Sequence, residues 1–205
     1  MSESLAVVKV GGSLFGWPDL GPRLRAWLAR PDAPWSDVLL VPGGGPTADV
    51  VRDLDRTHRL GERRAHWLAL RALAFNAHFL ADLLPLTGVI GHWEPLNADA
   101  PDSVYPIKRA SILDPCLFAA RDARARPDAA PPPCWAVTSD SIAARAAVVY
   151  GAGHLILLKS VTVPDGTDWE EAAERGWVDA WFARTIRPAL PRLRVRAVNL
   201  REWRP

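Results

Sequence analysis

With 205 residues, of which 49% are hydrophobic, the chain is long enough for a sizeable buried core, and we expect a single domain over residues 1–205. Its formal net charge of +2, without clustered lysines, argues against a nucleic-acid partner. No stretch approaches the roughly 20 apolar residues that cross a bilayer, and the first residues lack the basic segment of a signal peptide, so the sequence predicts a cytoplasmic protein with no membrane partner.

Predicted strands and helices alternate through the first part of the chain. Residues 5–10 form a mostly apolar run that ends in two glycines, which is typical of a buried parallel strand. Leucines and a tryptophan at helical spacing predict a helix over residues 19–30. Residues 37–41 predict a second buried strand, which is also followed by proline and glycines. Helices are expected over residues 46–55 and, from a long apolar stripe, over residues 61–84.

The middle of the chain predicts shorter elements. Short strands are expected over residues 88–91 and 104–113, and the proline-rich residues 125–133 predict a stiff surface loop. Residues 135–138 predict a strand that leads directly into a helix over residues 139–150.

The last part of the chain continues the alternation. Residues 154–158 predict a third buried strand, residues 168–186 a helix with a break at Gly176, and residues 193–200 a last strand. Strands that alternate with helices from end to end imply a mostly parallel sheet with helices on both faces. Ligands of such sheets bind at the carboxyl ends of the strands, so the residues that follow each strand are the candidates for function.

The first predicted strand carries Lys9 and ends in Gly11, Gly12 and Ser13. Glycines allow backbone N–H groups to approach phosphate oxygens without a Cβ in the way, and a lysine beside them can neutralise a phosphoryl group. The alternative is a lysine on an edge strand that extends to solvent, followed by an ordinary tight turn.

Gly43, Gly44 and Gly45 follow the second predicted strand. Three consecutive glycines cost about 1 kcal/mol each relative to alanine, a cost that is tolerated more readily where a ligand must contact the backbone. The alternative is a flexible loop. The chain contains neither the G-x-G-x-x-G dinucleotide pattern nor the G-x-x-x-x-G-K-[ST] phosphate loop, so these two nucleotide-binding motifs do not apply.

Thr138, Ser139 and Asp140 open a predicted helix. An acidic first turn after a threonine cap stabilises a helix by about 1 kcal/mol and needs no function. The functional interpretation places Asp140 between Lys9 and Lys159, where it would hold both ammonium groups and could reach Mg²⁺ through water.

Lys159 stands at the carboxyl end of the third buried strand, as Lys9 does in the first. A lysine in such a place is unfavourable unless it is paired, faces a ligand or extends to solvent. Lysine occurs only at positions 9, 108 and 159, so two of the three at strand ends favour a functional role. His66, near the start of the long helix, could face an acceptor on the glycine triplet; the alternative is a packed or surface histidine.

Four segments, in this order, resemble the amino-acid-kinase family, which includes acetylglutamate, uridylate and isopentenyl phosphate kinases. They are VVKVGGS at 7–13, LVPGGG at 40–45, TSDSIAA at 138–144 and LLKSV at 157–161. The resemblance covers most of the chain and implies an α/β fold, a three-layer αβα sandwich with a mostly parallel central sheet. It also implies a small-molecule kinase that uses ATP and Mg²⁺ and transfers the γ-phosphoryl group in line.

The resemblance implies a role for each candidate residue. Lys9 and Lys159 would neutralise the transferring group, and Asp140 would organise them. The residues expected to bind phosphate or nucleotide are Gly11, Gly12, Ser13, Thr138, Ser139, Ser160, Asp165 and Gly166. Those expected to bind the acceptor are Gly43, Gly44, Gly45 and His66. Mg²⁺ would be held through the nucleotide, with Asp140 as the one candidate contact, and the protein would be a homodimer or a higher homo-oligomer.

Within the family, the short chain and RAHWLAL at 64–70 look most like the kinases of methanofuran biosynthesis, which act on a furan-methyl phosphate in one-carbon metabolism. Residues 1–134 would form the acceptor-side lobe and residues 135–205 a shortened nucleotide-side lobe, since 46 residues follow Lys159. Two alternatives stay open. One is a kinase that acts on a carboxylate and forms an acyl phosphate, and the other is a catalytically inactive binding or regulatory protein with the family fold.

Overall fold

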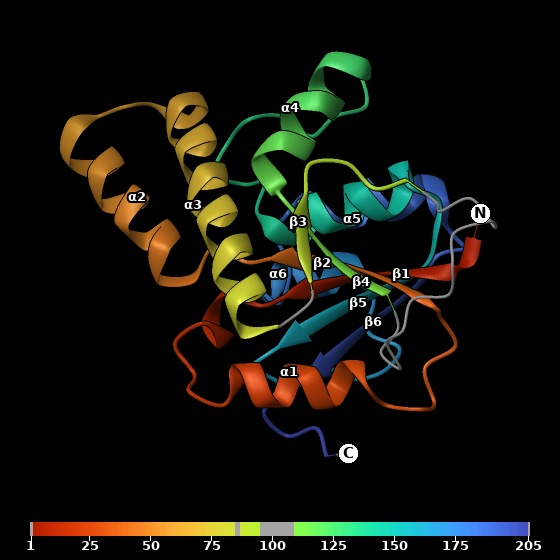
Figure 1. Cartoon of the computed structure of the whole chain (residues 1–205). Helices are drawn as coiled ribbons and strands as arrows, with labels where there is room; N and C mark the ends of the chain where they lie inside the picture. Colours follow the sequence, from red (N-terminus) through yellow and green to blue (C-terminus); the bar gives the residue numbers. More distant parts are fainter. Residues whose placement is uncertain (1, 85–86, 95–108, 205) are drawn as a thin grey trace.

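A computed structural model describes residues 2–84, 87–94 and 109–204. Within these residues the strands form one parallel sheet in the order β3-β4-β2-β1-β5-β6 (Figure 1). The strands are β1 (Ser2–Val10), β2 (Asp37–Pro42), β3 (Gly88–Ile90), β4 (Arg109–Leu113), β5 (Ala152–Lys159) and β6 (Arg194–Asn199). Because every pair is parallel, the carboxyl ends of these strands meet at one edge of the sheet.

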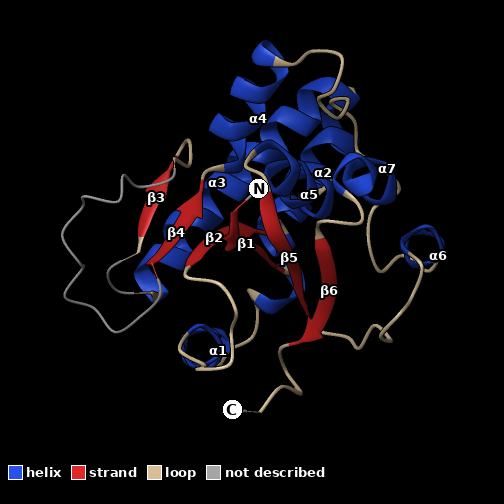
Figure 2. Ribbon diagram, turned by 90° about the vertical axis from the view of Figure 1, so that its right-hand side faces the viewer, coloured by secondary structure: helices blue, strands red, loops and turns tan. Residues whose placement is uncertain are grey.

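Helices cover both faces of this sheet (Figure 2). They are α1 (Leu20–Leu28), α2 (Gly45–His58), α3 (Glu62–Leu83), α4 (Pro115–Ala125), α5 (Ser139–Val149), α6 (Trp169–Glu174) and α7 (Phe182–Ile186), with 3-10 turns η1 (Gly12–Leu14) and η2 (Arg187–Ala189). Helix α1 lies on one face, and α4, α5 and α7 lie on the other. The predicted three-layer αβα sandwich with a parallel central sheet is therefore confirmed.

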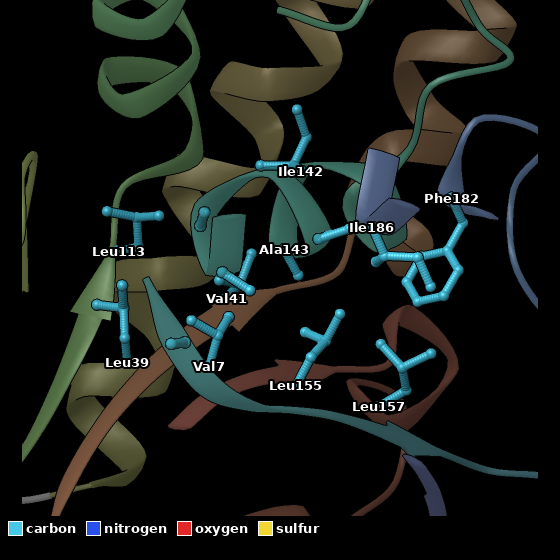
Figure 3. Packing of buried hydrophobic residues seen from close by; sticks show 14 of the residues in the cluster. Val7, Leu39, Val41, Leu113, Ile142, Ala143, Leu155, Leu157, Phe182 and Ile186 are labelled. Atoms are coloured by element: carbon cyan, nitrogen blue, oxygen red, sulfur yellow. The ribbon is translucent and has the colours of Figure 1, made fainter. Parts of the chain in front are cut away.

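The two buried layers follow from the alternation of side chains along each strand. Val7 and Leu155 point toward α5 and α7, where they pack in one apolar cluster with Phe182 (Figure 3). Their neighbours point the other way, and Val8 packs with Leu24 of α1 in a second cluster. The face to which a strand-end side chain points is thus fixed by its position in the strand.

Helix α4 has no counterpart among the predicted elements, although its start carries a clear signal. The Asp114 carboxylate accepts hydrogen bonds from the backbone N–H groups of Cys116 (2.8 Å) and Leu117 (2.9 Å). Pro115 occupies the first position of the helix, where its missing N–H is not needed. The buried Phe118 then attaches the helix to the core.

The strand predicted over residues 135–138 is wrong. These residues form a turn that is followed by the extended cap of α5. The Trp135 indole N–H donates to the Asp55 carboxylate at 2.8 Å instead of packing on the sheet. Both edges of β1 are already occupied by β2 and β5, so no central place in the sheet is open to this segment.

The remaining predicted elements are present with changed bounds. The helix predicted over residues 168–186 is the pair α6 and α7, and Gly176, with φ +70°, lies in the interruption between them. The strand predicted over residues 104–113 is present as β4, while residues 104–108 lie outside the described residues. Among the described helices, none is both long and apolar enough to cross a membrane.

Candidate active site

Lys9 and Lys159 stand at the carboxyl ends of two neighbouring strands, β1 and β5. Lys9 lies opposite Leu157 in the register, so Lys159 is two residues further along its strand. Because side chains alternate between the faces, both lysines share the face on which Leu157 packs beneath α5. Helix α5 begins at the same edge of the sheet, and its first turn brings Asp140 between the two lysines.

The Asp140 carboxylate binds both ammonium groups. Its Oδ1 lies 2.9 Å from Nζ of Lys9, and Nζ of Lys159 lies 3.0 Å from Oδ1 and 2.9 Å from Oδ2. All three side chains are buried: the exposed fractions are 4% for Lys9, 6% for Asp140 and 9% for Lys159. The lysines therefore do not extend to solvent, and the charged residues that the sequence singles out lie together in one cluster.

Burial and charge act in opposite directions on this cluster. Burial disfavours the charged carboxylate, but Lys9 and Lys159 outweigh it and hold the pKa of Asp140 below its usual value. The pKa of Lys159 is lowered to about 8, chiefly by burial and next by repulsion from Lys9, although Asp140 opposes the change. Two cations share one anion, so a charged cluster carries a net positive charge at the strand ends. An additional anion beside the two lysines would be stabilised.

The loops that follow β1 and β2 contact each other through glycines. A Cβ on Gly12 would stand 2.4 Å from the backbone nitrogen of Gly45, and Gly45 itself has a φ of +52°. A Cβ on Gly11 would stand 2.6 Å from the carbonyl oxygen of Leu158, the residue before Lys159. These glycines let the two loops and the end of β5 approach one another closely.

Asn76 holds the glycine loop from the side of α3, and it is not among the residues predicted from the sequence. Its side-chain Nδ2 donates to the carbonyl oxygens of Gly43 and Gly44, each at 2.7 Å. Its Oδ1 accepts a hydrogen bond from the Thr47 hydroxyl at 3.0 Å. Asn76 is only 3% exposed. The one signal in the sequence is a polar residue on the apolar stripe of a helix.

The helical turn η1 and the helix α2 both begin at these glycines. Neither Gly11, before η1, nor Gly44, before α2, provides a side-chain hydrogen bond to the first turn. The first N–H groups of a helix have no partner within the helix, and the helix dipole adds partial positive charge there. The start of α2, together with the backbone N–H groups of the glycine turn at η1, forms a surface suited to phosphate oxygens.

A cavity of about 180 Å³ adjoins the glycine loops. It is lined by Gly12 and Gly45, by Ser139 at the start of α5, and by His66 and Trp135. Nδ1 of His66 lies 2.9 Å from the Cys134 carbonyl oxygen, a contact in which Nδ1–H is the donor. Burial lowers the pKa of His66, although this hydrogen bond opposes the change, so the site favours the neutral ring.

Ser13 and Ser160 meet at the ends of β1 and β5. Their hydroxyl oxygens are 2.7 Å apart, and a guanidinium nitrogen of Arg201 donates to the Ser13 carbonyl oxygen at 3.4 Å. This contact is exposed, and Ser160 directly follows Lys159 in the chain. Asp165 and Gly166 lie in an exposed turn further on, and in the described part of the chain neither forms a hydrogen bond or ion pair with that cluster.

Thr138 faces a residue that sequence reasoning missed. The Thr138 N–H and hydroxyl both donate to the carboxylate of Asp179, at 2.9 and 2.8 Å, and its Oγ1 accepts from the Asp140 N–H at 3.4 Å. Asp179 lies between α6 and α7, in a segment predicted only as part of a broken helix. Nothing in the sequence around it indicates that it contacts α5.

The arrangement combines a buried cationic cluster, two glycine loops and a small cavity. It can bind a polyanion at the strand ends and hold a second, small molecule beside it. Within residues 2–84, 87–94 and 109–204, no group of three or more His, Cys, Asp or Glu side chains is placed to hold a metal ion. The chemistry that these residues offer is positioning and charge neutralisation.

No protein-family model matches the chain. In sequence it is similar to the [5-(aminomethyl)furan-3-yl]methyl phosphate kinase of Methanocaldococcus jannaschii, with 27% identity over 136 residues. The match includes 66% of this chain and 56% of that protein, so the chain spans little more than half of the relative's length.

Solved structures with the same arrangement of strands and helices cover nearly the whole chain. The uridylate kinase of Archaeoglobus fulgidus matches with a TM-score of 0.58 at 15% identity, over 97% of this chain and 92% of its own. The UMP kinase of Bacillus anthracis matches with a TM-score of 0.61 at 14% identity, over 97% and 88% of the two chains. The aspartate kinase of Synechocystis matches with a TM-score of 0.57 at 14% identity, over 94% of this chain and 37% of its own. The chain therefore has the fold of the amino-acid kinases, and its predicted resemblance to that family is confirmed.

Proposed function

We propose that the chain is a phosphotransferase that moves the γ-phosphoryl group of ATP to a small-molecule acceptor. The observation that carries this proposal is the pair of buried ammonium groups, from Lys9 and Lys159, bound to the single carboxylate of Asp140 at the strand ends. Phosphoryl transfer requires little covalent participation of the protein and depends on alignment and on neutralising the charge of the transferring group.

The three charged residues divide this task. Lys9 and Lys159 would contact oxygens of the transferring group from neighbouring strands. Asp140 already accepts hydrogen bonds from both, so it would keep the ammonium groups charged and oriented. The backbone N–H groups at the starts of η1 and α2 would bind the remaining phosphate oxygens. Mg²⁺ would enter with the nucleotide phosphates, whose charge it neutralises, because this ion is bound largely through phosphates and water.

The cavity beside Gly12 and His66 is the proposed acceptor site. Its volume of about 180 Å³ suits a small molecule, and its position next to the glycine loops supports an acceptor site beside the proposed phosphate site. The relative from Methanocaldococcus jannaschii makes a furan-methyl phosphate the first acceptor to test. A carboxylate acceptor, which would give an acyl phosphate, is the second.

The proposal favours an active enzyme over an inactive binding protein. A protein that only binds phosphate would not need two buried lysines around one carboxylate, because burying them is unfavourable without a compensating role. The likeness to the two uridylate kinases extends over 92% and 88% of their chains. The division into an acceptor-side lobe over residues 1–134 and a shortened nucleotide-side lobe over residues 135–205 stays a prediction. The homodimer and the cytoplasmic location stay predictions, the former to be checked by light scattering.

The test combines nucleotide binding with turnover. Calorimetry with Mg-ATP should give a saturable binding curve. The melting temperature of the protein should rise with nucleotide concentration, because a ligand that binds the native state stabilises it by mass action. ADP release should then rise when a furan-methyl phosphate is added and stay at background in the Lys159→Met variant. Absence of any binding at millimolar Mg-ATP would overturn the proposal. Binding without turnover on any phosphate or carboxylate acceptor would instead favour the regulatory alternative.

A further inference from the structure

The carboxylate of Asp179 collects five hydrogen bonds at the start of α5. Its Oδ2 accepts from the N–H of Thr138 (2.9 Å), the hydroxyl of Thr138 (2.8 Å) and the N–H of Ser141 (2.9 Å). Its Oδ1 accepts from the Ser141 hydroxyl and from the N–H of Trp181 (3.0 Å). One carboxylate therefore satisfies four donors from the cap and first turn of α5 and one from its own turn.

The four donors from α5 lie on both sides of Asp140 in the chain. Thr138 precedes Asp140 by two residues and Ser141 follows it directly, so Asp179 fixes the backbone on each side. Ser141 is fully buried, which leaves the first turn of α5 little freedom to rotate. The direction of the Asp140 side chain toward Lys9 and Lys159 follows from the direction of this turn.

We propose that Asp179 is the positioning residue of the site: it holds the first turn of α5 so that Asp140 keeps Lys9 and Lys159 aligned. The catalytic consequence rests on the proposed phosphotransferase function. Asp179 itself touches none of the reacting groups and acts through Asp140.

An ordinary helix cap would not have this arrangement. Thr138 already serves as the cap residue, since its Oγ1 accepts from the Asp140 N–H. Asp179 adds a charged acceptor from 38 residues beyond Ser141 and ties the start of α5 to the segment between α6 and α7. It also places a negative charge at the N-terminus of α5, where it interacts favourably with the helix dipole.

The experiment uses the scarcity of lysine. The chain has three lysines, so protein labelled with ¹³C at lysine Cε gives three side-chain NMR signals, which single Lys→Arg variants assign. At pH 7 and without nucleotide, Asp179→Asn should shift the signals of Lys9 and Lys159, because Asn cannot accept at both oxygen positions. The matched control is Asp168→Asn, which makes the same change at the capping aspartate of α6 and should leave both signals in place.

A role limited to stability predicts a different result. If Asp179→Asn unfolds at lower temperature but leaves the signals of Lys9 and Lys159 unmoved, the proposal is wrong. Should Asp179→Asn fail to fold, Ser141→Ala removes one donor and keeps the carboxylate. It should move the same two signals by a smaller amount, and the proposal is equally wrong if it moves neither.

Turnover provides a second measurement that separates this inference from the proposed function. In Asp179→Asn, kcat should fall on the order of tenfold to a hundredfold with little change in KM for Mg-ATP, since a small displacement of a reacting group has effects of this size. The lysine signals need no nucleotide. A chain that shows the signal shifts but never binds Mg-ATP would overturn the phosphotransferase and its catalytic consequence, while the structural coupling of Asp179 to the lysines would stand.

Discussion

Gly43 lies so close to Gly12 that a Cβ on Gly43 would stand 2.4 Å from the backbone nitrogen of Gly12. The atoms that such a Cβ would meet belong to the backbone of Gly12 and Val10, so none can rotate away. The loops that follow β1 and β2 thus pack backbone against backbone. This contact requires glycine at both positions whether or not a ligand binds. It also fixes the directions of the starts of η1 and α2.

Alanine at either position should therefore push the two loops apart. We expect Gly12→Ala and Gly43→Ala each to lower the free energy of unfolding by about 1–3 kcal/mol, the usual effect of overpacking. The matched control is Gly16→Ala, since a Cβ there meets no atom within 4 Å. Urea denaturation of the three variants is the measurement. Equal stability of all three would show that the loops separate without strain.

The second prediction concerns Asn76, which holds the same loop. Asn76→Ala leaves the carbonyl oxygens of Gly43 and Gly44 without their side-chain donor in a buried place. We expect a loss of about 1–3 kcal/mol in the free energy of unfolding, the range for a buried polar group that loses its partner. Asn199→Ala is the control, because the bond from Asn199 to Thr162 lies at the surface. The expectation fails if both variants unfold at the same urea concentration.

Local sequence reasoning succeeds where an element carries its own signal. Lys9 and Lys159 could be predicted as a pair because each ends an apolar run, and parallel strands bring such ends to one edge. Asn76 and Asp179 could not, because their partners are distant in the chain and a single polar residue has no periodic pattern. Residues around Trp135 have strand-forming composition, yet a strand also needs an open neighbour in the sheet, and β1 has none.

The third prediction concerns the lysines themselves. Lys9→Met and Lys159→Met each remove a charge that matters most in the transition state, so kcat should fall on the order of a hundredfold or more. KM for Mg-ATP should rise less than kcat falls. Lys159→Arg is the informative comparison, because it keeps the charge but changes the shape of the donor. Near-native turnover in either Met variant would mean that the lysine is structural.

The fourth prediction is a pH dependence set by Lys159. Its pKa is lowered to about 8, chiefly by burial, so a growing share of free enzyme loses the Lys159 charge as the pH rises through 8. We expect kcat/KM to decline above about pH 8, because it reports the free enzyme. The decline in kcat should lie at higher pH, since bound phosphate favours the ammonium form. A profile of kcat/KM that stays flat to pH 10 would contradict the assignment of this charge to catalysis.

The last prediction tests whether Asp140 is more than the acidic first turn of a helix. In that limited role, Asp140→Asn should lower the free energy of unfolding by roughly 0.3–1 kcal/mol, because only the interaction with the helix dipole is lost. In the structure, the same change leaves Lys9 and Lys159 buried without their shared anion. Removal of one partner from a buried ion pair lowers the free energy of unfolding by about 3–5 kcal/mol. We therefore expect Asp140→Asn to lose stability of that order at pH 7, together with a large fall in kcat.

The pH dependence of this loss identifies its cause. The pKa of Asp140 is held below its usual value by the two lysines, against the effect of burial, so its stabilising contribution is full above about pH 4 and disappears as the pH falls further. Urea unfolding should therefore show a difference in the free energy of unfolding between wild type and Asp140→Asn. We expect this gap to be wide at pH 7 and to narrow toward pH 3. The gap should also narrow at pH 9, where Lys159 can lose its proton and no longer needs an anion. A small gap that is constant across this range would identify Asp140 as a helix cap.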